Sequence, residues 1–126
     1  MFVVDTHALV GYLLNKLPKK ADDVFQESER GEFVIFVPTI VLAELNYLIK
    51  DERIKVDFNG LIEKIESSDN FISVPLNLEL IKLLPKVQIK EIHDQIIVAT
   101  AKYLNCKLVT KDEDIKKSRQ VDVVWD

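Results

Sequence analysis

The sequence predicts an α/β fold with a mostly parallel central sheet of four to five strands and helices on both faces. Short apolar runs of strand length alternate with longer stretches of helical period along the 126 residues. Proline or glycine ends several of these elements, and no linker rich in Gly, Ser or Pro divides the chain. Because parallel strands joined by helices are covered on both faces, we expect one layered domain over residues 1–126.

The first quarter of the chain predicts one buried strand followed by two helices. Residues 2–5, FVVD, form a short apolar run that ends in an acid. Residues 6–17 show apolar side chains at helical spacing, and Pro18 stops the pattern because proline cannot continue a helix. Residues 19–32 are mostly polar and predict a surface helix that ends near Gly31.

The second and third strands enclose two further helices. Residues 33–38, FVIFVP, are apolar and of strand length. Residues 39–52 follow this strand directly and carry an apolar stripe of helical period. Residues 56–70 predict a second helix, although Gly60 within it disfavours helix. Residues 71–75, FISVP, predict the third strand.

The last third of the chain continues the alternation. Residues 76–85 predict a short amphipathic helix that Pro85 closes. Residues 91–105 carry apolar side chains at a clear helical spacing. The remaining expected elements are a strand over residues 106–110, a helical turn or two over 112–118 and a final strand over 121–125.

The composition indicates a globular protein of the cytoplasm. Hydrophobic residues make up 48% of the chain, which is too many for a disordered protein. No apolar run reaches the ~18 residues of a membrane span, and the first segment carries Asp5 and His7, unlike a signal peptide. Cys106 is the only cysteine, which excludes a disulfide framework. Because the net charge is −4, a nucleic acid would have to be held by local basic patches or bound cations.

Two acids fall at the carboxyl ends of predicted strands, where ligands bind in parallel sheets, and two more lie within the first turns of predicted helices. Asp5 closes the first strand, and Asp112 follows the fourth. Glu44 lies in the second turn of a helix that begins just after a strand, and Asp94 lies near the start of the helix over residues 91–105. Carboxylates gathered at one edge would repel one another unless a cation neutralised them.

Three of these acids also have a purely structural interpretation. Asp5 and Asp112 occupy positions favoured for helix N-caps. Thr110 with Glu113 matches a capping box, which offers another start for the same helix as Asp112. Asp94 in a first turn would stabilise its helix through the dipole by ~0.3–1 kcal/mol.

Glu44 is harder to explain by capping. Its neighbours at helical spacing are all apolar or aromatic, namely Ile40, Val41, Tyr47 and Leu48. The spacing therefore places the carboxylate within a stripe that we expect to be buried, where an unpaired charge costs several kcal/mol. Glu44 either has a chemical role there or lies at the edge of the helix.

The four acids offer only oxygen ligands. Such sets suit Mg²⁺ or Mn²⁺, which use a few carboxylates together with water and substrate phosphates. A site of this kind activates water for phosphodiester hydrolysis. The hydroxyls of Thr6, Thr39 and Thr110 stand beside three strand ends, where they either support carboxylates and bound water or cap helices.

A basic cluster surrounds Asp112 in the sequence. It consists of Lys111, Lys116, Lys117 and Arg119. Solvated surface is the ordinary interpretation of such a cluster, but its place next to a predicted site residue favours contact with an RNA backbone.

Four segments of the chain resemble the motifs of PIN-domain ribonucleases, and most closely those of the small VapC-like toxins of toxin–antitoxin pairs. The segments are VVDTHALVGYLL, VPTIVLAELNYLI, EIHDQIIVATA and KLVTKDEDI, in the family's order and across nearly the whole chain. The resemblance implies a three-layer α/β/α sandwich and a divalent-metal-dependent endoribonuclease. It also implies an RNA substrate, a homodimer, and a cognate antitoxin that blocks the site.

The resemblance assigns metal-binding and catalytic positions residue by residue. The family's acids, which bind Mg²⁺ or Mn²⁺, correspond to Asp5, Glu44, Asp94 and Asp112, and its polar neighbours to Thr6 and Thr110. Two departures stand out. Gln95 follows the third acid, where similar sequences often carry a basic residue, and Asp114 is an alternative to Asp112 as the fourth acid.

We therefore expect a metal-dependent endoribonuclease that acts as the toxin of a type II toxin–antitoxin system. The alternative is a PIN-like module that binds RNA or a protein partner without turnover, which the negative net charge and Gln95 favour. A two-component receiver domain is disfavoured, because the third predicted strand is followed by LNLE and lacks an acceptor aspartate.

Overall fold

The central sheet has five strands, and all of them are parallel. The computed structural model describes residues 1–126, and the strand order is β3-β2-β1-β4-β5. The strands are β1 (Phe2–Val4), β2 (Ile35–Pro38), β3 (Phe71–Val74), β4 (Lys107–Val109) and β5 (Val123–Val124). The predicted parallel sheet is therefore confirmed, at the upper limit of the expected strand number.

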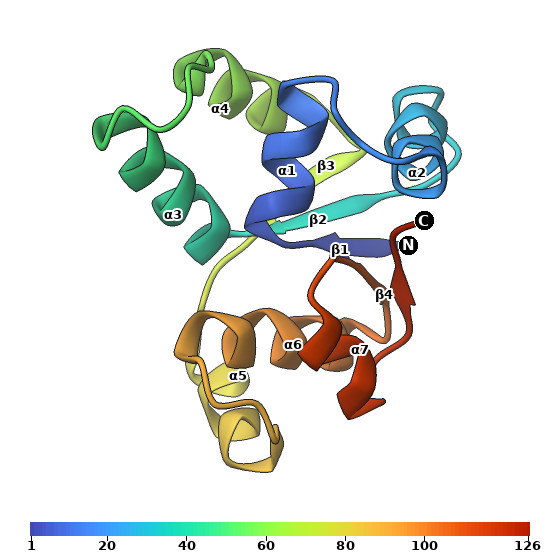
Figure 1. The fold of residues 1–126 in the computed structure, drawn as a ribbon, viewed down its shortest axis with the longest axis vertical. Helices are drawn as coiled ribbons and strands as arrows, with labels where there is room; N and C mark the ends of the chain where they lie inside the picture. The colour runs from blue at the N-terminus through green and yellow to red at the C-terminus, as the bar shows by residue number, and fades with distance from the viewer.

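Helices cover the sheet on both faces. They are α1 (Thr6–Leu13), α2 (Lys19–Glu29), α3 (Thr39–Lys50), α4 (Phe58–Ser67), α5 (Leu78–Leu83), α6 (Ile92–Leu104) and α7 (Glu113–Ser118). Figure 1 shows α1 to α4 above the sheet and α5 to α7 below it. The predicted three-layer α/β/α sandwich is confirmed. None of the helices has both the length and the apolar character needed to cross a membrane.

β1 lies at the centre of the sheet. Val3 pairs with Phe36 of β2 on one side and with Leu108 of β4 on the other. Val3 and Val4 are fully buried. Because helices cover both faces of this strand, apolar residues continue without alternation until Asp5.

The strand order creates a switch point between β1 and β4. From β1 the chain runs through α1 and α2 to β2, whereas from β3 it returns through α5 and α6 to β4, on the other side of β1. The helices that follow β1 and β4 therefore lie on opposite faces of the sheet (Figure 1). Ligands bind beyond the carboxyl ends of two such strands in sheets of this kind, and we call this end of β1 and β4 the crevice.

The helix expected over residues 6–17 ends earlier, at Leu13. Asn15 adopts a left-handed conformation with φ 56°, and the Lys16 amide donates to the Gly11 carbonyl at 2.8 Å. The chain has thus turned before Pro18, which instead stands at the N-cap of α2. The helix ends early because asparagine tolerates the left-handed region and can end a helix without proline.

The helix expected over residues 76–85 is divided in two. α5 begins after Asn77, whose side chain accepts the Leu80 amide at 3.1 Å, and it ends at Leu83. Pro85 does not close it, because it lies in the first residues of a 3₁₀ turn over Leu84–Lys86. Proline is tolerated there since the first residues of a helical turn need no N–H donor.

Candidate active site

Asp5 follows β1 directly and is buried, with an exposed fraction of 5%. Its Oδ1 accepts the Ala8 amide at 2.8 Å and so caps α1. Its Oδ2 accepts the hydroxyl of Thr110, which lies just beyond β4. Burial raises the pKa of Asp5, and the hydrogen bonds from Thr110 and Ala8 limit that rise. Asp5 is therefore both a helix cap and a fixed carboxylate in the crevice.

Thr110 and Asp112 form the β4 side of the crevice. Thr110 is fully buried, and its Oγ1 accepts the Asp112 amide at 3.1 Å. Oδ1 of Asp112 accepts the Ile115 amide at 3.0 Å and caps α7. The cap of α7 is thus Asp112, and the alternative start at Thr110 is wrong. Capping thus uses one carboxylate oxygen of Asp112, as it does at Asp5, and the negative charge of Asp112 remains at the crevice.

Glu44 reaches the crevice from α3. The hydroxyl of Thr6, at the start of α1, donates to Glu44 Oε1 at 2.9 Å. Glu44 is half-buried, but Tyr47 on the same side of the helix is 60% exposed. The expectation of a buried stripe around Glu44 is therefore wrong on this flank. The helix face forms the wall of an open cleft, so the carboxylate keeps contact with solvent.

Asp94 completes the acid cluster, which we define as Asp5, Glu44, Asp94 and Asp112. It lies in the first turn of α6. Its pKa is raised from 3.8 to about 6, first by burial and then by the negative charges of Asp112, Glu91, Asp5 and Glu44. These carboxylates thus lie near enough to repel one another, although they come from four separate segments of the sequence.

Glu91 is a fifth acid near the site, and the sequence pattern did not predict it there. It caps α6, since its Oε2 accepts the Asp94 amide at 2.7 Å. Its Oε1 contacts His93 Nδ1 at 2.6 Å, and this hydrogen bond is the main reason why the pKa of His93 is raised. The signal that could have found Glu91 is its place three residues before Asp94, at the start of an apolar helix.

No lysine or arginine forms a salt bridge with a member of the acid cluster. All salt bridges of the chain involve other acids. No three side chains of His, Cys, Asp or Glu lie close enough together to hold a metal ion among themselves. The residues nevertheless fit Mg²⁺ or Mn²⁺, because these cations keep several waters and need only one or two carboxylates beside substrate phosphates. The mutual repulsion that raises the pKa of Asp94 is what a cation would relieve.

A cleft of about 580 Å³ opens beside the acid cluster. Thr6 and Glu44 form part of its wall, and His93, next to Asp94, forms another part. The remaining lining consists of exposed and half-buried apolar side chains of α3 together with His7 and Arg53. Hereafter this space is called the α3 cleft.

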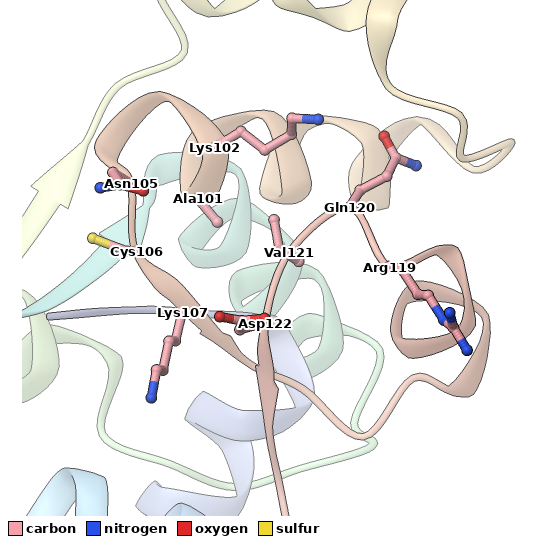
Figure 2. A pocket seen from close by; sticks show the side chains of 9 residues that line it. All are labelled: Ala101, Lys102, Asn105, Cys106, Lys107, Arg119, Gln120, Val121 and Asp122. Atoms are coloured by element: carbon pink, nitrogen blue, oxygen red, sulfur yellow. The ribbon is translucent and has the colours of Figure 1, made fainter.

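A second cavity, of about 440 Å³, lies at the other end of the strands (Figure 2). Lys107 begins β4 and Asp122 directly precedes β5, so this cavity adjoins the amino ends of both strands. No member of the acid cluster lines it. Figure 2 shows Arg119 at its margin, with the guanidinium pointing away from Cys106. We therefore place the candidate active site at the crevice.

The predicted RNA contacts lie at different distances from the crevice along the chain. Lys111 is exposed and directly precedes Asp112. Lys116 and Lys117 are exposed in the last turn of α7. Arg119 follows the helix and belongs to the margin of the second cavity. The cluster is thus a series of positive charges along α7, which begins at the acid cluster.

Three further residues lie near the site without joining it. Thr39 is exposed at the first position of α3, and its side chain makes no capping hydrogen bond. Gln95 donates to the Ile89 carbonyl at 2.6 Å, so its amide holds the preceding loop. Asp114 is exposed in the first turn of α7.

The sequence profile of the PIN domain matches residues 2–120, which is nearly the whole chain. The chain belongs to the PIN-domain family. The resemblance carried by the four motifs is thus confirmed. No curated protein shows a significant match to the chain.

Solved structures share the fold of this PIN domain. VapBC2 from Rickettsia felis, in a structure bound to promoter DNA, matches with a TM-score of 0.69 and 21% identity over 99% of this chain and 98% of that one. FitAcB from Neisseria gonorrhoeae matches with a TM-score of 0.69 and 19% identity, over 98% of this chain and 96% of that one. A chain of a toxin–antitoxin complex from Klebsiella pneumoniae matches with a TM-score of 0.62 and 17% identity, over 98% of this chain and 96% of that one. At these identities the likeness establishes the fold, and its coverage spans almost the full length of each chain.

Proposed function

We propose that this PIN domain is an endoribonuclease that hydrolyses RNA phosphodiester bonds with Mg²⁺ or Mn²⁺. The observation that carries the proposal is the gathering of Asp5, Glu44, Asp94 and Asp112 around one crevice without any lysine or arginine partner. Surplus negative charge of this kind disfavours a purely structural role, because unpaired carboxylates repel one another. Membership of the PIN-domain family supports a nuclease.

Asp5 and Asp94 are the proposed direct metal ligands. Asp5 is held in one orientation by the Ala8 amide and the Thr110 hydroxyl, which suits a ligand that must not move. The negative charges of Asp112, Glu91, Asp5 and Glu44 act on Asp94, and a bound cation would offset them.

The other two acids have supporting roles in this proposal. Glu44, oriented by the Thr6 hydroxyl, positions the metal or a water molecule. Asp112 completes the negative charge of the site while it anchors α7. When bound, the cation would polarise the phosphate and lower the pKa of the attacking water.

We further propose that the protein is the toxin of a type II toxin–antitoxin system in the cytoplasm, inhibited by a cognate antitoxin. The support is the likeness to chains of the Rickettsia, Neisseria and Klebsiella structures, two of which are named as VapBC2 and as a toxin–antitoxin complex. A small DNA-binding protein encoded in the neighbouring reading frame would be the expected antitoxin. Co-purification of the two products would test the pairing directly.

A homodimer is the proposed assembly. Leu78 and Ile81 are 68% and 40% exposed and lie three residues apart on α5, so they share one face of this short helix. Exposed apolar side chains on one helix face are typical of an interface. Sedimentation equilibrium should give twice the chain mass, and Ile81→Glu should shift it toward the monomer.

Cleavage of RNA tests the central proposal. Wild-type protein should cut RNA with Mg²⁺ or Mn²⁺ and stop when EDTA removes the metal. Asp5→Asn should be inactive yet folded, because asparagine can still cap α1 and the Thr110 hydroxyl can rotate to accept from the new amide. Asp69→Asn, at an exposed position before β3, is the matched control and should remain active.

Two outcomes would overturn the proposal. Equal cleavage by wild type and Asp5→Asn would show that the acid cluster is not the catalytic site. RNA binding without cleavage in any metal would favour the alternative, a non-catalytic module that binds RNA or a partner.

A further inference from the structure

The second cavity, at the amino ends of β4 and β5, is separate from the proposed catalytic site. Its volume of about 440 Å³ lies within the range of roughly 300–1,000 Å³ that small-molecule sites occupy. No residue lines both this cavity and the α3 cleft. Lys107 begins β4 at the cavity, whereas Thr110 and Asp112 follow the other end of the same strand. A ligand in this cavity would therefore bind apart from the acid cluster.

Positive charge surrounds the second cavity. Its lining contains three basic residues, Lys102, Lys107 and Arg119, and one acid, Asp122. None of these four residues forms a salt bridge. The local surplus of positive charge contrasts with the net charge of −4 of the whole chain. Uncompensated cations around a hollow surface attract anions, because their fields add together.

Helix ends explain only part of this basic lining. Lys102 lies in the last turn of α6 and Arg119 directly follows α7, and the helix dipole favours a cation at both places. Lys107 begins a strand, so no helix end explains it. Each helix end contributes about half a negative charge, which together with Asp122 still leaves the basic residues in excess.

Gln120 supplies an unused hydrogen-bond donor in the lining of the same cavity. Its Oε1 accepts the Gln88 amide at 3.2 Å. Its Nε2 is buried and has no partner, and it is the only buried side-chain nitrogen or oxygen of the chain in this condition. Buried donors are nearly always satisfied, so one that is not indicates an acceptor that the protein does not itself provide. The donor and the basic residues thus favour the same kind of ligand, an oxyanion.

We propose that the second cavity binds the phosphate group of a small molecule. The three basic residues balance the charge of the phosphate, and Nε2 of Gln120 donates to one of its oxygens. A phosphate monoester suits this lining better than a carboxylate, because at pH 7 it carries a charge of about −1.5 to −2 and three strong acceptor oxygens. The inference goes beyond the proposed ribonuclease function and does not depend on it.

Binding requires small movements of the lining. Figure 2 shows the three basic side chains spread around the cavity, with their charged ends pointing in different directions. Because Nε2 of Gln120 is buried, a ligand oxygen reaches it only when the connection between α7 and β5 shifts slightly. The mobility lost by these side chains offsets part of the attraction, so we expect a Kd of about 0.1–1 mM.

Titration followed by ¹⁵N–¹H NMR spectra tests both the binding and its place. The titrants are adenosine monophosphate (AMP), inorganic phosphate and adenosine, in Tris buffer freed of metal ions so that no cation joins a phosphate to the acid cluster. AMP should cause saturable shifts in the amides of residues 101–107 and 119–122 and in the side-chain amide of Gln120. Adenosine should cause none. Tighter binding of AMP than of phosphate would identify an ester as the ligand, and equal binding would identify free phosphate.

Matched lysine variants separate the cavity from general charge. Lys102→Gln with Lys107→Gln should weaken AMP binding at least about tenfold, because two cations near the phosphate are lost. Lys20→Gln with Lys50→Gln changes the net charge equally at exposed positions outside the cavity. This control should keep the affinity within about twofold, since distant charges are screened. All four lysines are exposed, so both double variants should fold.

Gln120→Glu tests the buried donor. The new side chain keeps an acceptor for the Gln88 amide and replaces the donor with a negative oxygen, so AMP binding should be lost. Asp5→Asn should bind AMP as the wild type does, because Asp5 lies at the opposite end of the strands.

Four results would overturn the proposal. The first is the absence of saturable shifts with AMP and with phosphate up to about 10 mM, well above the expected Kd. The second is binding of adenosine as tight as that of AMP, and the third is equal weakening by both double variants. The fourth is loss of AMP binding in Asp5→Asn, which would place the ligand at the acid cluster. None of these measurements uses RNA cleavage, so failure of the proposed ribonuclease function would leave them unchanged.

Discussion

Thr110 donates a hydrogen bond to the Asp5 carboxylate, although 105 positions separate the two residues in the sequence. The bond joins the ends of β1 and β4 across the switch point of the sheet. The same hydroxyl accepts the Asp112 amide at 3.1 Å. One uncharged side chain thus fixes two members of the acid cluster relative to each other.

Replacing Thr110 by valine should destabilise the protein by about 1–3 kcal/mol, because the buried Asp5 carboxylate would lose a donor. The pKa of Asp5 should rise further, since this hydrogen bond now limits the effect of burial. Urea denaturation at pH 7 measures the loss. Thr110→Ser keeps the hydroxyl and should recover most of the stability, whereas an equal loss in both variants would assign the effect to packing of the methyl group.

Asp94→Asn should make the metal-free protein more stable at pH 7. The pKa of Asp94 in the folded protein is about 6, above the 3.8 of an ordinary aspartate, so the folded state binds more protons between these values. The contribution of Asp94 to stability is therefore complete below about pH 4 and is lost as pH rises through about 6. After allowance for solvent screening, the gain at pH 7 should reach up to about 1 kcal/mol and vanish near pH 4.

Thermal unfolding in EDTA across this pH range measures the difference, with Asp69→Asn as a control that should follow the wild type. Magnesium should make the wild type more stable than Asp94→Asn, the reverse of the order in EDTA. A cation at 100 times its Kd adds about 2.7 kcal/mol to the wild type, and it should add less when a ligand is missing. A difference between Asp94→Asn and wild type that does not change with pH would contradict the repulsion among the acids.

The strands and most helices of this chain could be predicted from sequence because burial on both faces leaves long apolar runs between short polar segments. The helix ends could not be predicted equally well. Proline at position 18 suggested the end of α1, but Asn15 had already turned the chain through a left-handed conformation. Capping geometry is decided by single backbone angles, which hydrophobic period does not report.

The acid cluster was partly predictable for a related reason. Asp5 and Asp112 follow strands, and topology brings strand ends together, so their proximity follows from the α/β pattern alone. The surroundings of Glu44 did not follow, because a helical stripe looks the same whether it faces the core or an open cleft. Glu91 was missed because a capping glutamate at the surface has no pattern that distinguishes it from solvated charge.

Asparagine variants can show whether Asp112 or Asp114 is the fourth acid, because asparagine removes the negative charge but keeps an oxygen that can cap a helix. Asp112→Asn keeps a capping oxygen for the Ile115 amide, so stability should change by less than about 0.5 kcal/mol. It removes a negative charge that repels Asp94, so Mn²⁺ affinity should fall on the order of tenfold. Isothermal titration calorimetry with Mn²⁺ measures this. Asp114→Asn should leave the affinity near the wild-type value, and a larger loss there would move the fourth acid to Asp114.

Lys116 and Lys117 should contribute to RNA binding through phosphate contacts that depend on salt. Each such contact to a single strand adds about 0.7 to the slope of log affinity against log salt concentration. Lys116→Gln with Lys117→Gln, in the inactive Asp5→Asn protein, should therefore lower the slope by about 1.4. The matched control replaces Lys19 and Lys20, two exposed lysines at the start of α2, and should leave the slope unchanged. If the α2 pair lowered the slope and the α7 pair did not, the RNA backbone would cross the opposite face of the sheet from α7 (Figure 1).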